Sequence, residues 1–212
     1  MNRFLDILAK TLSVVFYPLF VPTYGIGLFC YAYSTQVQPL TGAWIAVAIG
    51  GTFILTCLLP ITSIWILMKK GEVKNLSIEN PRERTMPYLY ATMGFVFWSY
   101  LLLKVLHAPF AISCVAVGAT AAIGLVLLIN HWWKISAHLA GFGGLLGGLF
   151  SYCLSFGAIP TWGTLCVWLV LSLALMGARL YLKAHTPAQV CAGWLLGLAS
   201  TFLPYCIFCY VG

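Results

Sequence analysis

The sequence predicts an all-α fold, a bundle of about seven helices that cross a membrane. The first observation is composition: of the 212 residues, 62% are hydrophobic and only 7% are charged. The second is that the apolar stretches are each about 20 residues long, the length that a helix needs to cross the hydrocarbon core of a bilayer. Soluble domains do not have this composition, so we expect one integral membrane domain over residues 1–212.

The predicted spans follow one another with short connections. They cover residues 11–33, 42–68, 87–107, 109–131, 138–157, 161–182 and 187–210. The first apolar run has no small-residue cleavage site, so we expect a span there rather than a signal peptide. Only "HAPF" separates the third and fourth spans, which predicts a tight helical hairpin. Glycines such as Gly143 and Gly147 give the fifth span a face of small residues, which predicts the close approach of another helix.

Three polar segments are expected on one side of the membrane. They are "KKGEVKNLSIENPRERTMP", "HWWKISAH" and "ARLYLKAHTP", and they follow the second, fourth and sixth spans. In a seven-span chain those three loops lie on the same side as the N-terminus. The polar residues of these segments are therefore able to meet in one site.

The charges exclude several kinds of chemistry. The net charge is +7, and no carboxylate follows Arg84. This argues against a buried carboxylate proton relay, a carboxylate metal site or a glycosidase pair. Arginine, lysine and histidine side chains instead suit an anionic ligand, phosphate above all. Among the eight cysteines, Cys206 and Cys209 form a C-x-x-C without a second pair or a nearby histidine, so we expect small buried hydrophobic residues and no metal site.

The segment "HTPAQ" has the pattern of a helix start. Thr186 is a suitable N-cap, Pro187 fits the first helical position, and Gln189 completes a capping box. His185 then lies at a helix N-terminus, where free N–H groups favour an anion, and Arg179 precedes it by six residues. The alternatives are that Gln189 is only a cap partner and that Arg179 extends to the membrane interface.

The other two segments repeat this chemistry. In "KISAHLAG", Lys134 precedes Ser136, a plausible N-cap, and His138 falls in the first helical turn. In "NPRERTMP", Arg82 and Arg84 add two cations, although a solvated loop in which they pair with nearby glutamates is the alternative. Two histidines at helix starts, each with a cation near it, predict that His138 and His185 share one anion site.

The three segments resemble the motifs of the type 2 phosphatidic acid phosphatases, membrane relatives of the vanadium haloperoxidases, over about residues 70–200. The family's third motif, S-R-x5-H-x3-D, is matched at Arg179 and His185, and its second, P-S-G-H, at Ser136 and His138. The first, K-x6-R-P, is matched only at Arg84. Ala178 replaces the serine of the third motif and Gln189 replaces its aspartate.

The resemblance implies a six-span core with a possible extra span, and a metal-independent phosphatase of a lipid phosphate or diphosphate that needs no cofactor. His185 would be the nucleophile, His138 would protonate the leaving alkoxide, and Gln189 would stand where the aspartate orients the nucleophile. Groups that would hold the phosphoryl oxygens are Arg179, Ser136, Arg84, Lys134 and Arg82. Non-hydrolytic binding or transport of a lipid phosphate is the alternative, because Gln189 brings no charge, and a purely structural protein is a third possibility.

The expected partners are the bilayer and a lipid phosphate, and no nucleic acid is expected. Four cations without a catalytic role lie on the N-terminal side: Arg3, Lys10, Lys69 and Lys70. The positive-inside rule therefore favours a site on the cytoplasmic side of the plasma membrane.

Overall fold

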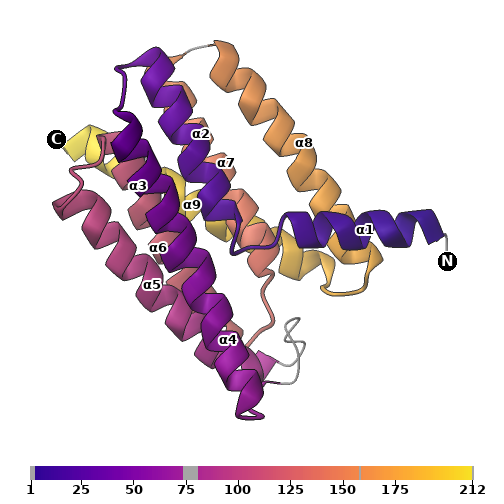
Figure 1. The fold of residues 1–212 in the computed structure, drawn as a ribbon. Coiled ribbons are helices and arrows are strands. Elements are labelled where there is room, and N and C mark those ends of the chain that lie inside the picture. The colour runs from indigo at the N-terminus through magenta and orange to yellow at the C-terminus, as the bar shows by residue number, and fades with distance from the viewer. Residues whose placement is uncertain (1–2, 74–80, 158, 212) are drawn as a thin grey trace.

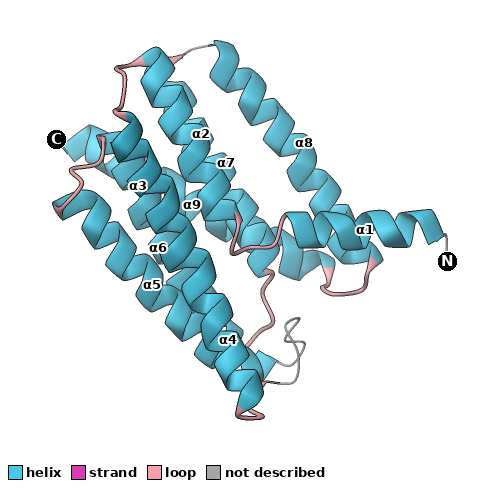
Figure 2. Ribbon diagram, in the orientation of Figure 1, coloured by secondary structure: helices cyan, strands magenta, loops and turns pink. Residues whose placement is uncertain are grey.

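The computed structural model describes residues 3–73, 81–157 and 159–211, and all regular structure in these ranges is helical (Figures 1 and 2). The helices are α1 (Arg3–Val15), α2 (Val21–Gln36), α3 (Gly42–Phe53), α4 (Leu59–Lys69), α5 (Thr85–Lys104), α6 (Phe110–Asn130), α7 (Ala137–Phe156), α8 (Ile159–Tyr181) and α9 (Pro187–Val211). A π-helical turn, η1 (Ile54–Leu58), joins α3 to α4, and a 3₁₀ turn, η2 (Pro81–Arg84), precedes α5.

Among the described residues, six helical segments are long and apolar enough to cross a membrane. They are Gly42–Lys69, Thr85–Lys104, Phe110–Asn130, Ala137–Phe156, Trp162–Tyr181 and Pro187–Ile207. Each corresponds to one of the last six predicted spans. These segments identify the chain as a helical membrane protein.

The prediction of one continuous helix over residues 11–33 is wrong. Helix α1 ends at Val15 and α2 begins at Val21, with turns between them. Pro18 explains the interruption, because proline has no N–H to donate and also disfavours helical geometry at the preceding residue, Tyr17. Helix α2 has 16 residues, fewer than the roughly 20 that a full crossing requires.

Helix α1 lies across the end of α8 instead of running alongside the bundle (Figure 1). Phe4, Ile7 and Val14 are exposed along it at helical spacing, and Lys10 forms an ion pair with Asp6 at 2.8 Å. One apolar stripe beside a charged face is typical of a helix that lies at a membrane surface. The apolar residues of α1 therefore form one face of an amphipathic helix and are not part of a membrane-spanning helix.

Helix α7 is the central helix of the bundle. Of its most apolar 18-residue window, 72% is buried, against 17% to 33% for the other five candidate spans. It packs most extensively against α9, and glycines allow this: a Cβ at Gly143 would collide with the carbonyl oxygen of Trp194, and one at Gly197 with that of Ala140. The predicted close packing along the glycine-rich face is confirmed.

We expect Gly197→Ala to lower the thermal stability of the purified protein. The added methyl group forces α7 and α9 apart, and overpacking of this kind costs about 1–3 kcal/mol. Gly177→Ala in α8 is the matched control, because nothing lies within 4 Å of a Cβ there. That change should be neutral or stabilise the helix by up to about 1 kcal/mol. Equal melting temperatures for the two variants would contradict the packing described here.

Helices α5, α7 and α9 all begin at the end of the bundle where α4, α6 and α8 finish (Figure 1). The five-residue connection between α5 and α6 forms the predicted tight hairpin, and these two helices pack against each other. The described parts of the three polar segments therefore lie at the same end of the bundle, as predicted. We call this the site end.

Candidate functional site

Four of the predicted site residues line one cavity at the site end. Arg84 at the start of α5, His138 in the first turn of α7, Arg179 in the last turn of α8 and His185 just before α9 border a cavity of about 200 Å³. Arg84, His138 and His185 are each less than one-tenth exposed. Both histidines and Arg179 therefore line one shared pocket, the placement expected of a single anion site. Among the described residues, no aspartate or glutamate lines this cavity.

The capping box at the start of α9 forms as predicted and also orients His185. The backbone N–H of Thr186 donates to Oε1 of Gln189 at 3.1 Å, and the N–H of Gln189 donates to the Thr186 hydroxyl at 3.4 Å. Nδ1 of His185 lies 3.2 Å from the same Oε1. Because the Thr186 N–H is always a donor, the amide atom it meets is the oxygen, and Nδ1 of His185 must carry the proton. In the neutral imidazole the lone pair is then on Nε2.

The surroundings of His185 keep its imidazole neutral. Its pKa is lowered from the ordinary 6.5 to about 4, first by burial and then by the nearby Arg179 guanidinium, against the smaller opposing effect of the Gln189 hydrogen bond. Desolvation and a nearby cation both disfavour the charged imidazolium. At neutral pH the Nε2 lone pair is therefore available to attack an electrophile.

We expect the His185 ring to titrate far below the range of an ordinary histidine. Since its pKa in the folded protein is lowered, the ring stays neutral as the pH falls through 6.5 and takes up its proton only near pH 4. NMR titration of protein labelled at histidine ring carbons measures this, with the His185→Ala spectrum assigning the signal. A midpoint near 6.5 would contradict the burial and the cationic surroundings described here.

His138 is held by the segment that precedes α2. Its Nε2 lies 3.1 Å from the backbone carbonyl oxygen of Ser13, which can only accept, so Nε2 carries a proton. The ring of Tyr17 packs edge-on against the imidazole, with 5.5 Å between the ring centroids. Since the Nε2 proton is donated to the protein, a proton for a leaving group has to come from Nδ1, which requires the imidazolium form of His138.

Two arginines from different helices provide the positive charge of the cavity. Arg84 is buried, and its guanidinium donates a hydrogen bond to the hydroxyl of Tyr88. Arg179 is partly buried, and its Nε is shielded from solvent with no hydrogen-bond partner among the described residues. Two neighbouring guanidinium groups and an unsatisfied buried donor are unfavourable unless an anion lies between them. This arrangement is suited to a phosphoryl group.

Two further predicted phosphate-binding residues, Ser136 and Lys134, are not among the residues that line this cavity. Ser136 occupies the N-cap position of α7, but its hydroxyl does not cap the helix and has no hydrogen-bond partner among the described residues. Lys134 borders a shallow depression beside the cavity, together with Lys183, His185 and Gln189. The side chain of Arg82 lies outside the described part of the chain.

Two tyrosines belong to the site although the sequence reasoning did not identify them. Tyr17 and Tyr88 line the cavity near Arg84 and Arg179. Burial raises the pKa of Tyr17, and the nearby Tyr88 raises it further, so its hydroxyl stays protonated and able to donate a hydrogen bond to an anion. The signal for Tyr17 was the Tyr-Pro pair, which marks the helix break that brings this residue to the site end.

The described cysteines are not among the residues that line the anion-site cavity. Cys30, Cys57, Cys114 and Cys153 are buried as predicted, whereas Cys166 and Cys191 are exposed. The side chain of Cys209 lies outside the described part. Among the described residues, no group of three histidine, cysteine, aspartate or glutamate side chains could hold a metal ion.

No protein-family model, curated protein or solved structure matches this chain.

Proposed function

We propose that the protein is a membrane-embedded phosphatase that hydrolyses a lipid phosphate or diphosphate through a phosphohistidine intermediate at His185. One observation carries this proposal: Gln189 fixes the proton of His185 on Nδ1, which leaves the Nε2 lone pair in a cavity that two arginines line. The proposal is also supported by a likeness to the type 2 phosphatidic acid phosphatase motifs, which is carried by Arg179, His185, Ser136 and His138.

In the proposed reaction, Nε2 of His185 attacks phosphorus as the bond from phosphorus to the lipid oxygen breaks. Arg84 and Arg179 stabilise the charge on the non-bridging oxygens, which is the main requirement of phosphoryl transfer. The leaving alkoxide takes the proton from Nδ1 of the His138 imidazolium. The negative charge of the bound phosphate offsets the arginines and favours that imidazolium.

A water molecule completes the cycle. Its oxygen attacks the phosphohistidine, the bond from phosphorus to Nε2 breaks, and inorganic phosphate leaves. The proton that the water loses returns to Nδ1 of His138. All of these steps use side chains that line the cavity or contact one that does.

A second candidate function is the binding or transport of a lipid phosphate without hydrolysis. Gln189 favours it, because a neutral amide stabilises a developing imidazolium less than a carboxylate does. Phosphate release by the purified protein from a panel of lipid phosphates and diphosphates separates the two functions. Release that vanadate inhibits supports the phosphatase. Tight binding of the same lipids without any release would contradict it.

The effect of Gln189 on rate is testable with two substitutions. A carboxylate at this position forms a charge-assisted hydrogen bond to the His185 ring, roughly twice as strong as a neutral one, so we expect Gln189→Asp to raise the phosphorylation rate about tenfold. The fold should tolerate it, because acidic residues stabilise helix N-termini. Gln189→Ala should lower the rate, and single-turnover phosphate release measures all three proteins. If both variants behave like the parent, Gln189 is only a helix cap.

The proposal includes a cytoplasmic site and seven crossings, of which the first, α2, is shorter than the other six and is accommodated by local thinning of the bilayer. Helix α2 lies beside α3 and α7 in the bundle and starts at the site end (Figure 1). The positive-inside rule favours the cytoplasm for that end, since Lys69 and Lys70 lie there at the end of α4. A reporter fused to the C-terminus should therefore be found outside the cytoplasm. A cytoplasmic reporter would contradict this orientation, because α9 begins at the site end and crosses the membrane once.

A further inference from the structure

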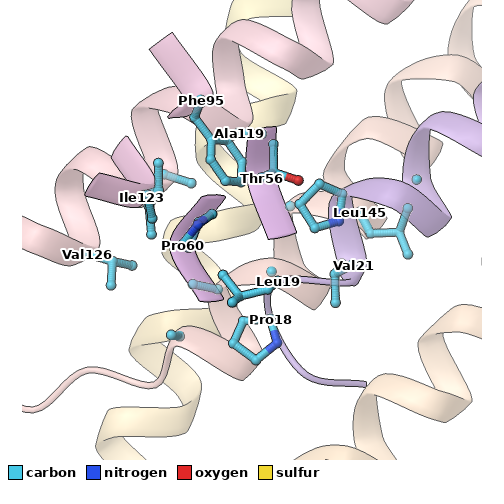
Figure 3. A pocket seen from close by; sticks show the side chains of 18 of the residues that line it. Pro18, Leu19, Val21, Thr56, Pro60, Phe95, Ala119, Ile123, Val126 and Leu145 are labelled. Atoms are coloured by element: carbon cyan, nitrogen blue, oxygen red, sulfur yellow. The ribbon is translucent and has the colours of Figure 1, made fainter. Parts of the chain in front are cut away.

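The cavity that holds the anion site continues into the bundle as an apolar channel. Its walls come from α2, from α3 and α4, and from α5, α6 and α7. Figure 3 shows side chains of these walls facing one another, among them Leu19, Val21, Phe95, Ile123 and Leu145. The charged and imidazole groups occur only where the cavity meets the site end.

The channel extends over most of the bundle's height. The lining residues of α5 recur at helical spacing on one face: Arg84, Pro87, Tyr88, Ala91, Phe95, Trp98 and Leu102. From Arg84 to Leu102 the helix rises by about 27 Å, close to the roughly 30 Å of a hydrocarbon core.

The polar side chains in the channel wall are already satisfied by the protein. The Trp98 indole donates to the Thr52 hydroxyl at 2.7 Å, and Thr52 donates to the Ala48 carbonyl oxygen at 2.7 Å. Thr56 donates to the Thr52 carbonyl oxygen at 2.8 Å. The Ser99 hydroxyl lies 2.7 Å from that of Thr120. With these groups paired, the wall offers little to water or to a polar ligand and suits a hydrocarbon.

We propose that this channel binds a single hydrocarbon chain of the substrate, whose phosphate lies between Arg84 and Arg179. The inference rests on the proposed function and adds the class of substrate: a phosphate attached to a chain that extends into the bundle. The apolar channel is continuous with the anion site. A hydrocarbon chain attached to a phosphate bound there would therefore lie directly beside the channel.

The channel selects by chain length rather than by general affinity for lipid. A chain in a bilayer is already out of water and gains little hydrophobic free energy by entering a protein. Steric fit decides instead. On α6, Ala119 and Ala116 line the channel at about 16 Å and 21 Å from Asn130 at the site end. In an extended hydrocarbon chain, C–C bonds of about 1.5 Å zigzag, so the chain advances about 1.3 Å per carbon. A chain of about 13 carbons therefore reaches Ala119, and one of about 16 carbons reaches Ala116.

The experiment fills the channel at these two positions and measures binding of alkyl phosphonates, whose carbon–phosphorus bond resists hydrolysis. The probes are octyl, dodecyl, hexadecyl and eicosyl phosphonate, and binding is followed by the rise in melting temperature that a ligand causes. Ala119→Phe should weaken hexadecyl and eicosyl phosphonate at least fivefold and leave octyl phosphonate unchanged. Ala116→Phe should weaken the eicosyl compound most and leave octyl and dodecyl phosphonate unchanged. Ala121→Phe is the control, since Ala121 is on the same helix but exposed.

Phosphate release from the matching alkyl phosphates separates this inference from the proposed function. Length-selective binding without release would leave the channel assignment intact and contradict the phosphatase. Release that ignores chain length, with Ala119→Phe and Ala116→Phe behaving like Ala121→Phe, would overturn the channel assignment alone. Because the two channel variants differ in the length they exclude, a general loss of folding in one of them cannot reproduce the expected pattern.

Discussion

We expect His185→Ala to reduce the hydrolysis of lipid phosphates by roughly a thousandfold or more, the scale of losing a catalytic nucleophile. Alanine removes the atom that would bond to phosphorus. In the proposed cycle His138 does not replace it, because its Nε2 donates to the Ser13 carbonyl oxygen and its Nδ1 carries the proton for the leaving group. The measurement is the steady-state release of phosphate by purified protein. Melting temperatures show whether the variant is folded.

His131→Ala is the matched control for this loss. His131 is an exposed histidine that follows α6 and lies outside the cavity. Its removal should leave the rate within about twofold of the parent, as expected for a surface change far from the chemistry. Near-normal hydrolysis by His185→Ala would exclude His185 as the nucleophile, whatever the control shows.

We expect Arg179→Lys to reduce kcat by about 10- to 100-fold although the charge is retained. A planar guanidinium can donate two parallel hydrogen bonds to phosphoryl oxygens, whereas lysine presents a single compact charge. The shielded Nε of Arg179, which has no partner among the described residues, is one of the donors that this change removes. The loss should fall on kcat more than on KM, because these hydrogen bonds strengthen as charge develops on the oxygens.

Arg3→Lys controls for the chemistry of the substitution itself. Arg3 is exposed on α1 and lies outside the cavity, so this change should leave kcat and KM unaltered. An Arg179→Lys protein with unchanged kcat would show that Arg179 supplies only charge. The assignment of the guanidinium as a clamp would then be wrong.

The parts of the structure that follow from local chemistry could be predicted from the sequence. Six spans could be recognised because membrane helices are long and apolar. The capping box was readable because Thr186 and Gln189 are only three residues apart, and the same spacing places the Gln189 oxygen near His185. The meeting of the three polar segments followed from counting crossings.

The errors arise where apolar content has more than one physical explanation. The run from residue 11 to 33 satisfies the composition of a span, yet Pro18 ends one helix and α1 uses its apolar residues at the bundle surface. Ser136 has the side chain of a good N-cap and occupies the N-cap position, but its hydroxyl makes no capping hydrogen bond. Composition and residue type specify neither which face an apolar helix presents nor which rotamer a serine takes.

The parts of the site that depend on distant contacts could not be predicted. The Ser13 carbonyl oxygen and His138 are 125 residues apart in the chain, and a backbone acceptor carries no sequence signal. Tyr17 and Tyr88 reach the cavity from a helix break and from the first turn of α5. Only the tertiary arrangement at the site end brings these groups together with Arg179.

Trapping of the covalent intermediate tests the central claim most directly. Purified protein is mixed with a lipid phosphate carrying labelled phosphorus, quenched in alkali to preserve phosphohistidine, digested and analysed by mass spectrometry. The account predicts an alkali-stable, acid-labile phosphate on His185, and no such label in the His185→Ala protein. Continued release of phosphate with no label on His185, or with the label on His138 instead, would contradict it.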